Sequence, residues 1–344
     1  MKRKSRSSPA RAAMKLLCTL LGLILAVMLG ATLYFQHLLG QINYVDPDDI
    51  QQLTQEELNE FLASDDQEDS GAPAIDPSDV QFSEHDTLIG GPDSRLINIL
   101  LIGQDRREGE GRARSDSMIL CTFNKDTRQL TMTSFLRDLY VEIPGYYNNR
   151  INAAYAAGGM SLLNKTLEEN FGVCIDGNVE VDFNQFADII DLLGGVKMEL
   201  RQDEADLINN STGGSLTAGT QLLNGDQALE YARIRKLDAD GDFSRTNRQR
   251  KVMTALVEAY KDSNLTTILS LLDKILPMIT TDMSNSEILS LAMELFPMLS
   301  GAEIVSQRVP ADDTYSNRMI DGMSVLVADM DAARLMLDET LNGN

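Results

Sequence analysis

Arginine and aspartate side chains recur in this sequence beside three apolar runs that have the length of β-strands. The runs are residues 96–103, 118–123 and 130–135, and the charged residues beside them are Asp105, Arg114, Asp116, Arg137 and Asp138. The short segment between the second and third runs predicts a hairpin, which brings the start of one strand next to the end of the other. Arg114, Asp116 and Arg137 are therefore expected at one sheet edge. Asp105 joins them if the first strand runs antiparallel to the second.

A second set of polar residues lies further along the chain and consists of Arg233, Arg235, Arg245 and Gln249. Polar and apolar residues alternate over residues 231–235, which predicts a strand with both of its arginines on one face. A helix is expected to open near Arg245, with Asp242 or Ser244 as its cap. Helical spacing places Arg245 and Gln249 on the apolar stripe of that helix, at the end whose free N–H groups attract anions.

The number of these arginines indicates that they bind a multivalent anion. A single surface arginine–carboxylate pair contributes only about 0–1 kcal/mol, so any one of them could belong to a structural ion pair. Arginines left unpaired in a partly buried site would cost several kcal/mol each. An anion offsets that cost, because each charge-assisted hydrogen bond to a guanidinium group contributes roughly 1.5–3 kcal/mol. The planar guanidinium fork matches phosphate geometry, so phosphate or pyrophosphate is the predicted ligand.

Two aspartates do not suit a site that binds anions alone. Asp105 and Asp116 would repel a pyrophosphate unless a cation lay between them, and one or two carboxylates with phosphate oxygens and water are the usual ligands of Mg²⁺. We therefore predict a Mg²⁺ (or Mn²⁺) site at these two residues. The alternative, that they only pair with Arg106 or Arg114, stays open. The sequence has no Gly-Lys-Ser/Thr phosphate loop, which argues against an ordinary nucleoside triphosphatase.

The composition excludes several other functions. The two histidines, His37 and His85, both precede the predicted folded domain, so Ser-His-Asp catalysis and histidine-rich zinc sites are excluded from it. A net charge of -22 argues against a general nucleic-acid-binding surface, which would need a broad basic face. Cys121 and Cys174 are expected to be two buried free thiols, although a disulfide between them is possible.

The chain divides into four regions. Residues 1–15 carry a cluster of basic residues, and residues 16–36 form an apolar run long enough to cross a bilayer. The basic flank predicts a single-pass anchor with a cytoplasmic N-terminus, with a cleaved signal peptide as the alternative. Residues 37–95 are acidic and are expected to be a solvated extracytoplasmic spacer with one short helix, opened by the capping box of Thr54 and Glu57. Residues 96–344 are the predicted folded domain.

The folded domain mixes strands with helices. Helical patterns follow the three strands at residues 161–170, 183–193, 225–229, 245–260, 264–276 and 330–341. Strands combined with helices, including one hairpin, indicate an α/β fold, and specifically an α-β-α sandwich with a mixed central sheet.

Several blocks in this order resemble the LytR-CpsA-Psr family of cell-wall glycopolymer ligases. The resemblance covers residues 98 to about 256, and its blocks include NILLIGQDRR from Asn98, GRARSDSMIL from Gly111, TMTSFLRDLYVEIPG from Thr131, LNGDQALEYARIRK from Leu223 and DFSRTNRQR from Asp242. Two positions depart from the family pattern. Arg150 stands where the family usually has lysine, and Gln104 replaces a small residue before Asp105.

The resemblance implies a membrane-anchored enzyme that transfers a glycopolymer, such as teichoic acid or capsule, from a polyprenyl-pyrophosphate carrier to peptidoglycan with the help of Mg²⁺. Asp105 and Asp116 would hold the metal, and an apolar tunnel would take the polyprenyl tail. The implied pyrophosphate ligands are Arg114, Arg137, Arg233, Arg235, Arg245 and Gln249. Asp138 or Asp116 would be the general base, since no histidine is available.

Two other functions remain open from the sequence. A lipid-pyrophosphate phosphatase would use water as the acceptor with the same site. A non-catalytic module that senses lipid and regulates, for example as a transcriptional attenuator, would keep the arginines but need no metal. A sequence-specific DNA regulator is the least favoured, because the chain is acidic and carries a predicted anchor.

Overall fold

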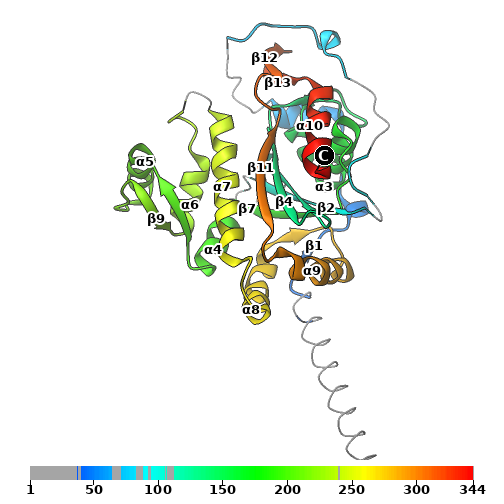
Figure 1. Ribbon diagram of the computed structural model, residues 1–344. Coiled ribbons are helices and arrows are strands. Elements are labelled where there is room, and N and C mark those ends of the chain that lie inside the picture. The colour runs from blue at the N-terminus through cyan, green and yellow to red at the C-terminus, as the bar shows by residue number, and fades with distance from the viewer. Residues whose placement is uncertain are drawn as a thin grey trace, which may run out of the picture.

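The computed structural model describes residues 37, 40–63, 71–82, 88–91, 94–104, 106, 112–238 and 241–343. Its centre is a seven-stranded sheet in the order β1-β10-β7-β2-β3-β4-β11 (Figure 1). The neighbours β2, β3 and β4 are antiparallel, whereas β7 is parallel to β2 and β11 is parallel to β4. The predicted mixed sheet is therefore confirmed. The strands are β1 (Asn43–Tyr44), β10 (Thr280–Thr281), β7 (Gly177–Asp182), β2 (Leu96–Gln104), β3 (Ser115–Asn124), β4 (Gln129–Phe135) and β11 (Glu303–Val309).

Helices cover both faces of this sheet. On one face, α2 (Gln55–Leu62), α3 (Asn152–Phe171) and α10 (Met330–Asn342) pack against β2 and β3 through a core that includes Leu100 and Leu120. On the other face, α7 (Asp242–Tyr260) and α9 (Asn285–Leu299) pack against the alternate residues of the same strands, such as Leu101 and Ile119. Burial on both faces explains why the central strands are nearly continuous apolar runs.

A smaller unit packs against α7 and has its own core (Figure 1). It consists of α4 (Phe183–Leu192), β8 (Val196–Leu200), α5 (Gln202–Thr212), β9 (Gly219–Leu223) and α6 (Gly225–Arg233). Helix α7 joins the two cores, since Val252 belongs to the small one and Met253 packs against the sheet. The other elements are β5 (Tyr140–Val141), β6 (Asn149–Arg150), α8 (Leu265–Ile275), β12 (Tyr315–Ile320), β13 (Met323–Ala328) and short 3-10 turns at Pro47–Asp49, Pro77–Asp79 and Leu276–Met278.

The expected strand over residues 231–235 is wrong. Helix α6 continues to Arg233, and residues 234 and 235 follow it without regular structure. Asn224 and Gln227 form a capping box at its start, and the buried residues Ala228, Tyr231 and Ala232 recur at helical spacing. The alternation that we read as a strand is the end of this buried helical stripe.

Two helix starts also differ from expectation. Helix α7 begins at Asp242 with Gly241 as its N-cap, so neither Asp242 nor Ser244 caps it. Gly241 has a φ of 47°, a conformation that suits glycine, and no side chain caps the helix. Helix α3 begins at Asn152 rather than near residue 161, and it is kinked where Gly158 and Gly159 leave helical geometry.

The described part of residues 37–95 is not a solvated spacer. The predicted helix is present as α2, with the Thr54–Glu57 capping box, but its Leu58 is completely buried. Phe61 also packs against the main core, and β1 adds a strand to the central sheet. Although the segment is acidic, the apolar side of α2 packs on α3, so this helix belongs to the folded domain.

Leu58→Ala tests this assignment of α2 to the domain. Because the side chain is fully buried, we expect the substitution to lower the free energy of unfolding by about 2–5 kcal/mol. Urea unfolding followed by circular dichroism measures this change. Glu56→Ala on the solvent side of α2 is the control and should have little effect; equal stabilities of Leu58→Ala and wild type would contradict the packing.

The predicted membrane anchor, residues 16–36, lies outside the described residues. Within the described part of the chain, no helix is long and apolar enough to cross a membrane. Cys121 and Cys174 are both free, as predicted, although each is only partly buried. Burial raises the pKa of the Cys121 thiol to about 12.

Candidate functional site

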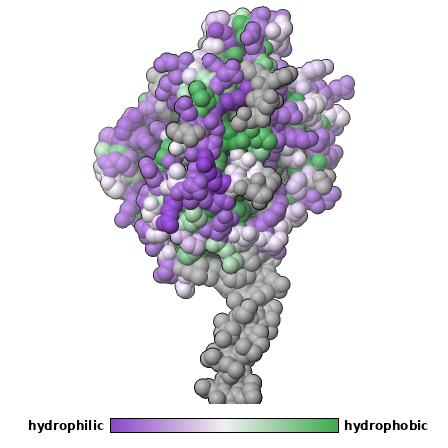
Figure 2. All heavy atoms as spheres, turned by 45° about the vertical axis from the view of Figure 1, so that its right-hand side comes forward, coloured by the Kyte–Doolittle hydropathy of each residue, from purple (hydrophilic) through white to green (hydrophobic). Residues whose placement is uncertain are grey.

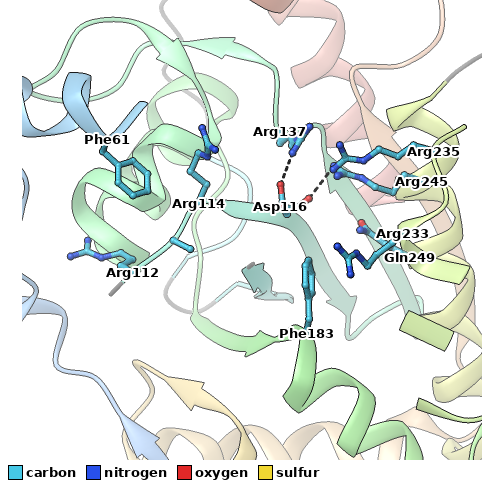
Figure 3. Close-up of a pocket in the computed structure, with 11 residues that line it drawn as sticks. Phe61, Arg112, Arg114, Asp116, Arg137, Phe183, Arg233, Arg235, Arg245 and Gln249 are labelled. Carbon is cyan, nitrogen blue, oxygen red and sulfur yellow. Dashed lines mark hydrogen bonds and ion pairs between the residues drawn. The ribbon is translucent and has the colours of Figure 1, made fainter. Parts of the chain in front are cut away.

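A cavity of about 710 Å³ lies where β3, β4, α6 and α7 come together (Figure 3). Six arginines and a single carboxylate line it, so it carries an excess of positive charge inside a chain of net charge -22. The complete lining is Phe61, Arg112, Ala113, Arg114, Asp116, Arg137, Phe183, Arg233, Arg235, Arg245 and Gln249. Figure 2 shows that strongly hydrophilic side chains gather on one face of the domain beside a more hydrophobic area.

Seven of the predicted site residues meet in this cavity. Asp116 comes from the start of β3, Arg114 from the segment before it, and Arg137 from just after β4, as the hairpin predicted. The others come from the end of α6, the residues after it and the first half of α7. They are Arg233, Arg235, Arg245 and Gln249. Asp105 is outside the described residues, but β2 does run antiparallel to β3, which was the condition for Asp105 to join this edge.

Asp116 is the carboxylate of the cavity, and it is held by arginines. Arg137 donates from Nη1 to Asp116 Oδ1 over 2.6 Å, and Arg245 donates from Nη2 to the Asp116 backbone oxygen over 3.2 Å (Figure 3). Burial alone would raise the pKa of Asp116, but the charges of Arg137, Arg245 and Arg235 outweigh it and lower the pKa. Asp116 is therefore ionised at neutral pH. Its partner is Arg137, neither of the two arginines that we considered.

Arg245 is a buried cation with too little negative charge around it. Its side chain is 2% exposed, and its Nη2 lies 2.8 Å from Asp242 Oδ1. Burial lowers its pKa to about 10, with Arg137 and Arg235 adding to the effect and Asp242 opposing it. Arg245 still carries its charge at neutral pH. Its lowered pKa indicates that the cavity would be stabilised by an added anion.

Asp242 contacts three of the cavity arginines instead of capping α7. Besides Arg245, its Oδ1 lies 3.8 Å from Arg137 Nε and 4.0 Å from Arg235 Nε. Asp116, Asp138 and Asp242 are three carboxylates beside the six arginines that line the cavity, so positive charge is in excess there. The excess charge is what a pyrophosphate, with its several negative oxygens, would offset.

Asp138 lies next to the cavity but is not among the residues that line it. Its carboxylate is 3.7 Å from Arg137 Nε and 3.6 Å from Arg150 Nη1. Burial raises its pKa, helped by the charge of Asp242 and opposed by Arg137 and Arg150. Asp138 is therefore a stronger base than Asp116, but its contacts are with the arginines rather than with the cavity.

Four lining residues were not predicted, and they are Phe61, Arg112, Ala113 and Phe183. Phe183 opens α4 and lies under Arg233, whose guanidinium carbon is 4.9 Å from the ring centre. Phe61 of α2 lies 5.9 Å from the Arg114 guanidinium carbon in the same kind of contact. Arg112 lines the cavity two residues before Arg114. Only Arg112 had a signal in the sequence, the alternation of arginines in GRARSD; the two phenylalanines reach the cavity through packing of distant segments.

An apolar cavity of about 250 Å³ adjoins the arginine cavity. Phe183, Arg233 and Gln249 line both, and Ser117 donates to Gln249 Oε1 over 3.0 Å at the junction. The remaining lining is almost entirely aliphatic and aromatic, from β2, β3, β7, α4, α6, α7, the end of α8 and the residue after the turn that follows it. It includes Leu101, Val179, Phe186, Ile190, Ala232, Met253 and Ile279. A charged cavity continuous with an apolar one suits a ligand with an anionic head and a hydrocarbon tail.

A second charged cavity, between α5, α6 and α7, provides a contrast. Its Arg248 is 4% exposed, almost as buried as Arg245, but it donates to two carboxylates, from Nε to Glu204 over 2.9 Å and from Nη2 to Asp238. Arg201 also binds Asp238, over 2.7 Å. The charges of this cluster are paired, so it has no comparable need for an anion.

Comparisons with known proteins agree with the sequence resemblance. The family model of the LytR-CpsA-Psr family matches residues 54–341. The regulatory protein MsrR of Staphylococcus aureus (strain COL) is 40% identical over 162 residues, which are 46% of this chain and 48% of MsrR. The chain thus spans about half the length of that relative. The polyisoprenyl-teichoic acid–peptidoglycan teichoic acid transferase TagT of Bacillus subtilis is 35% identical over 221 residues, 62% of this chain and 67% of TagT.

Solved structures of TagT share the fold. TagT bound to LIIa-WTA matches with a TM-score of 0.61 and 29% identity, over 75% of this chain and 98% of that chain. TagT with bound octaprenyl pyrophosphate lipid matches with a TM-score of 0.56 and 25% identity, over 75% of this chain and all of that one. The match of the family model, which begins at residue 54, also includes helix α2.

Proposed function

Because this chain belongs to the LytR-CpsA-Psr family, we propose that it is a transferase that moves a teichoic acid or similar glycopolymer from a polyprenyl-pyrophosphate carrier to peptidoglycan. The transferase activity named for TagT and the octaprenyl pyrophosphate bound in one of its structures support this reaction. In this chain, the main support for the proposed reaction is that the arginine cavity adjoins an apolar cavity, with Phe183, Arg233 and Gln249 lining both.

The two cavities divide the carrier between them. The pyrophosphate would lie among the arginines, where its charge replaces the missing counter-charge of Arg245. The prenyl tail would lie in the apolar cavity, whose lining offers it few polar groups. A cavity of 150 Å³ holds a benzene molecule, so the 250 Å³ observed here would take about ten carbons of the tail without rearrangement.

The arginines would act on the leaving group. The oxygen of the acceptor hydroxyl, which gives its proton to the general base, would form a bond to the anomeric carbon of the polymer or to the phosphorus that carries it. In the first case the bond from carbon to the pyrophosphate oxygen breaks and polyprenyl pyrophosphate leaves; in the second the bond between the two phosphorus centres breaks at the bridging oxygen and polyprenyl phosphate leaves. In both cases negative charge grows on the departing lipid phosphate group. Arg137, Arg245 and their neighbours are already oriented by Asp116 and Asp242, so they stabilise this charge without reorganising.

Asp116 fits one position of a metal site. It is an ionised carboxylate on the cavity wall, and phosphate oxygens and water would supply the remaining ligands of Mg²⁺ or Mn²⁺. Asp105 would be the second carboxylate. Among the described residues, no group of three or more histidine, cysteine, aspartate or glutamate side chains could hold a metal ion. Asp105 is not one of the described residues. When bound, the cation would neutralise charge on the leaving pyrophosphate.

The general base would be Asp138 or Asp116, with different merits. Asp116 lines the cavity, but its lowered pKa makes it a weak base. Asp138 has a raised pKa, but its contacts are with Arg137 and Arg150 beside the cavity. We favour Asp138, because its raised pKa makes it the stronger base and it lies beside Arg137 at the cavity.

We also propose that the domain is extracytoplasmic and tethered to the membrane by residues 16–36. The apolar run and its basic N-terminal flank support this arrangement. It would place the domain on the same side of the membrane as peptidoglycan and next to a carrier whose tail is dissolved in the bilayer.

A transfer assay with lipid-linked polymer, Mg²⁺ and peptidoglycan tests the proposal. We expect polymer to become covalently attached to peptidoglycan, with release of the lipid carrier only when acceptor is present. Release of phosphate that is undiminished without acceptor would identify a phosphatase instead. Tight binding of the carrier with no turnover under any of these conditions would favour a sensor.

Ala232→Phe tests the division of the carrier between the cavities. Ala232 is 4% exposed and lines the apolar cavity, so a phenyl ring there fills space that the tail needs. We expect affinity for farnesyl pyrophosphate to fall by about tenfold, since roughly 1.4 kcal/mol of apolar contact would be lost, while affinity for inorganic pyrophosphate stays within about twofold. Calorimetry measures both ligands, and a matched loss for the two would contradict the separate tail cavity.

A further inference from the structure

Gln104, Glu180 and Tyr155 form a buried hydrogen-bonded cluster beside the arginine cavity. They are 1%, 6% and 2% exposed, and they come from the end of β2, from β7 and from α3. The Gln104 amide nitrogen donates to Glu180 Oε1, and the Tyr155 hydroxyl donates to Glu180 Oε2. All three line a cavity of about 270 Å³ that shares Arg112 with the arginine cavity.

The other end of the Gln104 amide holds the segment that returns to the sheet. Its Oε1 accepts from the backbone N–H of Ala113 over 3.2 Å. The β2–β3 pairing becomes irregular between Gly103 and Gln104 and ends at Gln104 and Ser115. The Gln104 side chain therefore extends the attachment of this chain segment beyond the last strand pair, as a ladder hydrogen bond would.

Glu180 determines which end of the Gln104 amide faces Ala113. An amide presents a donor on one side and an acceptor on the other, so a partner that only accepts fixes the orientation. Both oxygens of Glu180 accept, Oε1 from the Gln104 amide nitrogen and Oε2 from the Tyr155 hydroxyl, which turns Gln104 Oε1 toward the Ala113 N–H. Burial raises the pKa of Glu180, and hydrogen bonds from Tyr155 and Gln104 and the charges of Arg106 and Arg112 oppose that rise. The two donors also satisfy a carboxyl group that would otherwise be buried without hydrogen bonds.

We propose that Gln104, Glu180 and Tyr155 are positioning residues: they act as a latch that holds residues 112–114 against the sheet and so places Arg112, Arg114 and Asp116 at the pyrophosphate. This inference rests on the proposed function. Arg112 and Arg114 flank the latched Ala113 and both line the arginine cavity. Asp105 directly follows Gln104 in the chain. The latch thus fixes both ends of the segment between β2 and β3, and it gives a role to the glutamine that departs from the family pattern.

An exchange of the two side chains is the sharpest test. Gln104→Glu places two carboxylates face to face and should lower the affinity of the full-length protein for farnesyl pyrophosphate, and its transfer activity, by about 10- to 100-fold at pH 8. The double variant Gln104→Glu/Glu180→Gln restores every hydrogen bond, because the new carboxylate accepts from Ala113 and from the new amide, which in turn accepts from Tyr155. It should recover to within about threefold of wild type.

Recovery in the double variant is a readout that a general loss of stability would not reproduce, because two independent losses of stability would add rather than cancel. A double variant as weak as the single one, or a Gln104→Glu protein that binds like wild type, would overturn the latch. Thermal unfolding of each variant confirms that it is folded at the temperature used.

Hydrogen exchange separates failure of the latch from failure of the proposed function. Gln104→Met keeps the side-chain volume and removes the acceptor of the Ala113 N–H, so exchange in the peptide that contains Ala113 should become about tenfold faster without any ligand. Unchanged exchange would overturn the latch whether or not the protein binds prenyl pyrophosphates. A wild-type protein that fails to bind farnesyl pyrophosphate, but shows the faster exchange in Gln104→Met, would refute only the proposed function.

Discussion

Replacing Arg245 by methionine is expected to make the protein more stable and to disable it. Arg245 is buried and its pKa is lowered to about 10, so the folded protein holds this charge less favourably than water does. Methionine has a similar length and needs no counter-charge, and Asp242 keeps Arg137 and Arg235 as partners. We expect the free energy of unfolding without ligand to rise by about 1–2 kcal/mol. Transfer activity should fall by about 100- to 1,000-fold.

Arg248→Met is the matched control for this prediction. Arg248 lies on the same helix and is buried to nearly the same extent, but it neutralises Glu204 and Asp238. Its loss would leave two carboxylates short of a partner and should destabilise the protein by about 3–5 kcal/mol. Urea unfolding of both variants, with and without pyrophosphate, measures the contrast. Destabilisation of both to the same degree would contradict our view that Arg245 awaits an anion.

Replacing Asp116 by asparagine is expected to remove most of the effect of Mg²⁺ on pyrophosphate binding. Without a divalent cation, the lost negative charge should tighten binding by about tenfold relative to wild type, since one like charge beside the ligand is removed. With Mg²⁺, wild type gains affinity through the metal, and the asparagine variant should gain little. Its transfer activity should fall by about 100-fold or more. Calorimetric titration of inorganic pyrophosphate at two Mg²⁺ concentrations measures both effects.

Asp138→Asn provides the comparison for Asp116. Both aspartates contact Arg137, but only Asp116 lines the arginine cavity. The Asp138 variant should retain the increase in pyrophosphate affinity with Mg²⁺ and lose transfer activity through the missing base. If both variants respond to Mg²⁺ as wild type does, neither aspartate holds the metal and the role of Asp116 is purely to orient Arg137.

Seven of the eleven residues that line the arginine cavity could be predicted, even where the secondary structure could not. Arg233 and Arg235 were expected on one face of a strand, whereas Arg233 ends helix α6 and Arg235 follows it. Both nevertheless line the cavity. An alternation of polar and apolar residues over only five positions is too short to distinguish a strand from the end of a helix. The residues that show the helix are the buried Ala228, Tyr231 and Ala232, and their burial depends on packing against α4 and α7.

The expectation of a solvated spacer failed because it relied on average composition. Acidic residues dominate residues 37–95, but Leu53, Leu58, Phe61 and Leu62 form an apolar stripe within them. A stripe of this kind is enough to dock one short helix when α3 offers a complementary surface. The apolar stripe can be read from the sequence, but the surface of α3 on which it packs cannot. The sequence therefore could not indicate that Phe61 reaches the arginine cavity.

The ion-pair partners of the charged residues also could not be predicted from the sequence. Asp116 was expected to pair with Arg106 or Arg114 if it bound no metal, and it pairs with Arg137. Asp242 or Ser244 was expected to cap α7, but neither does, and Asp242 contacts three arginines instead. Choices among neighbouring guanidinium groups depend on differences of one or two ångströms, which residue spacing does not determine.

A structure of the full-length protein with a polyprenyl pyrophosphate and Mg²⁺ tests the central claim most directly. We predict that the diphosphate lies within hydrogen-bond distance of Arg137 and Arg245 and that the first isoprene units lie beyond Phe183 in the apolar cavity. A diphosphate bound at another surface, for example beside Arg201 and Arg248, with the arginine cavity left to solvent, would contradict the account.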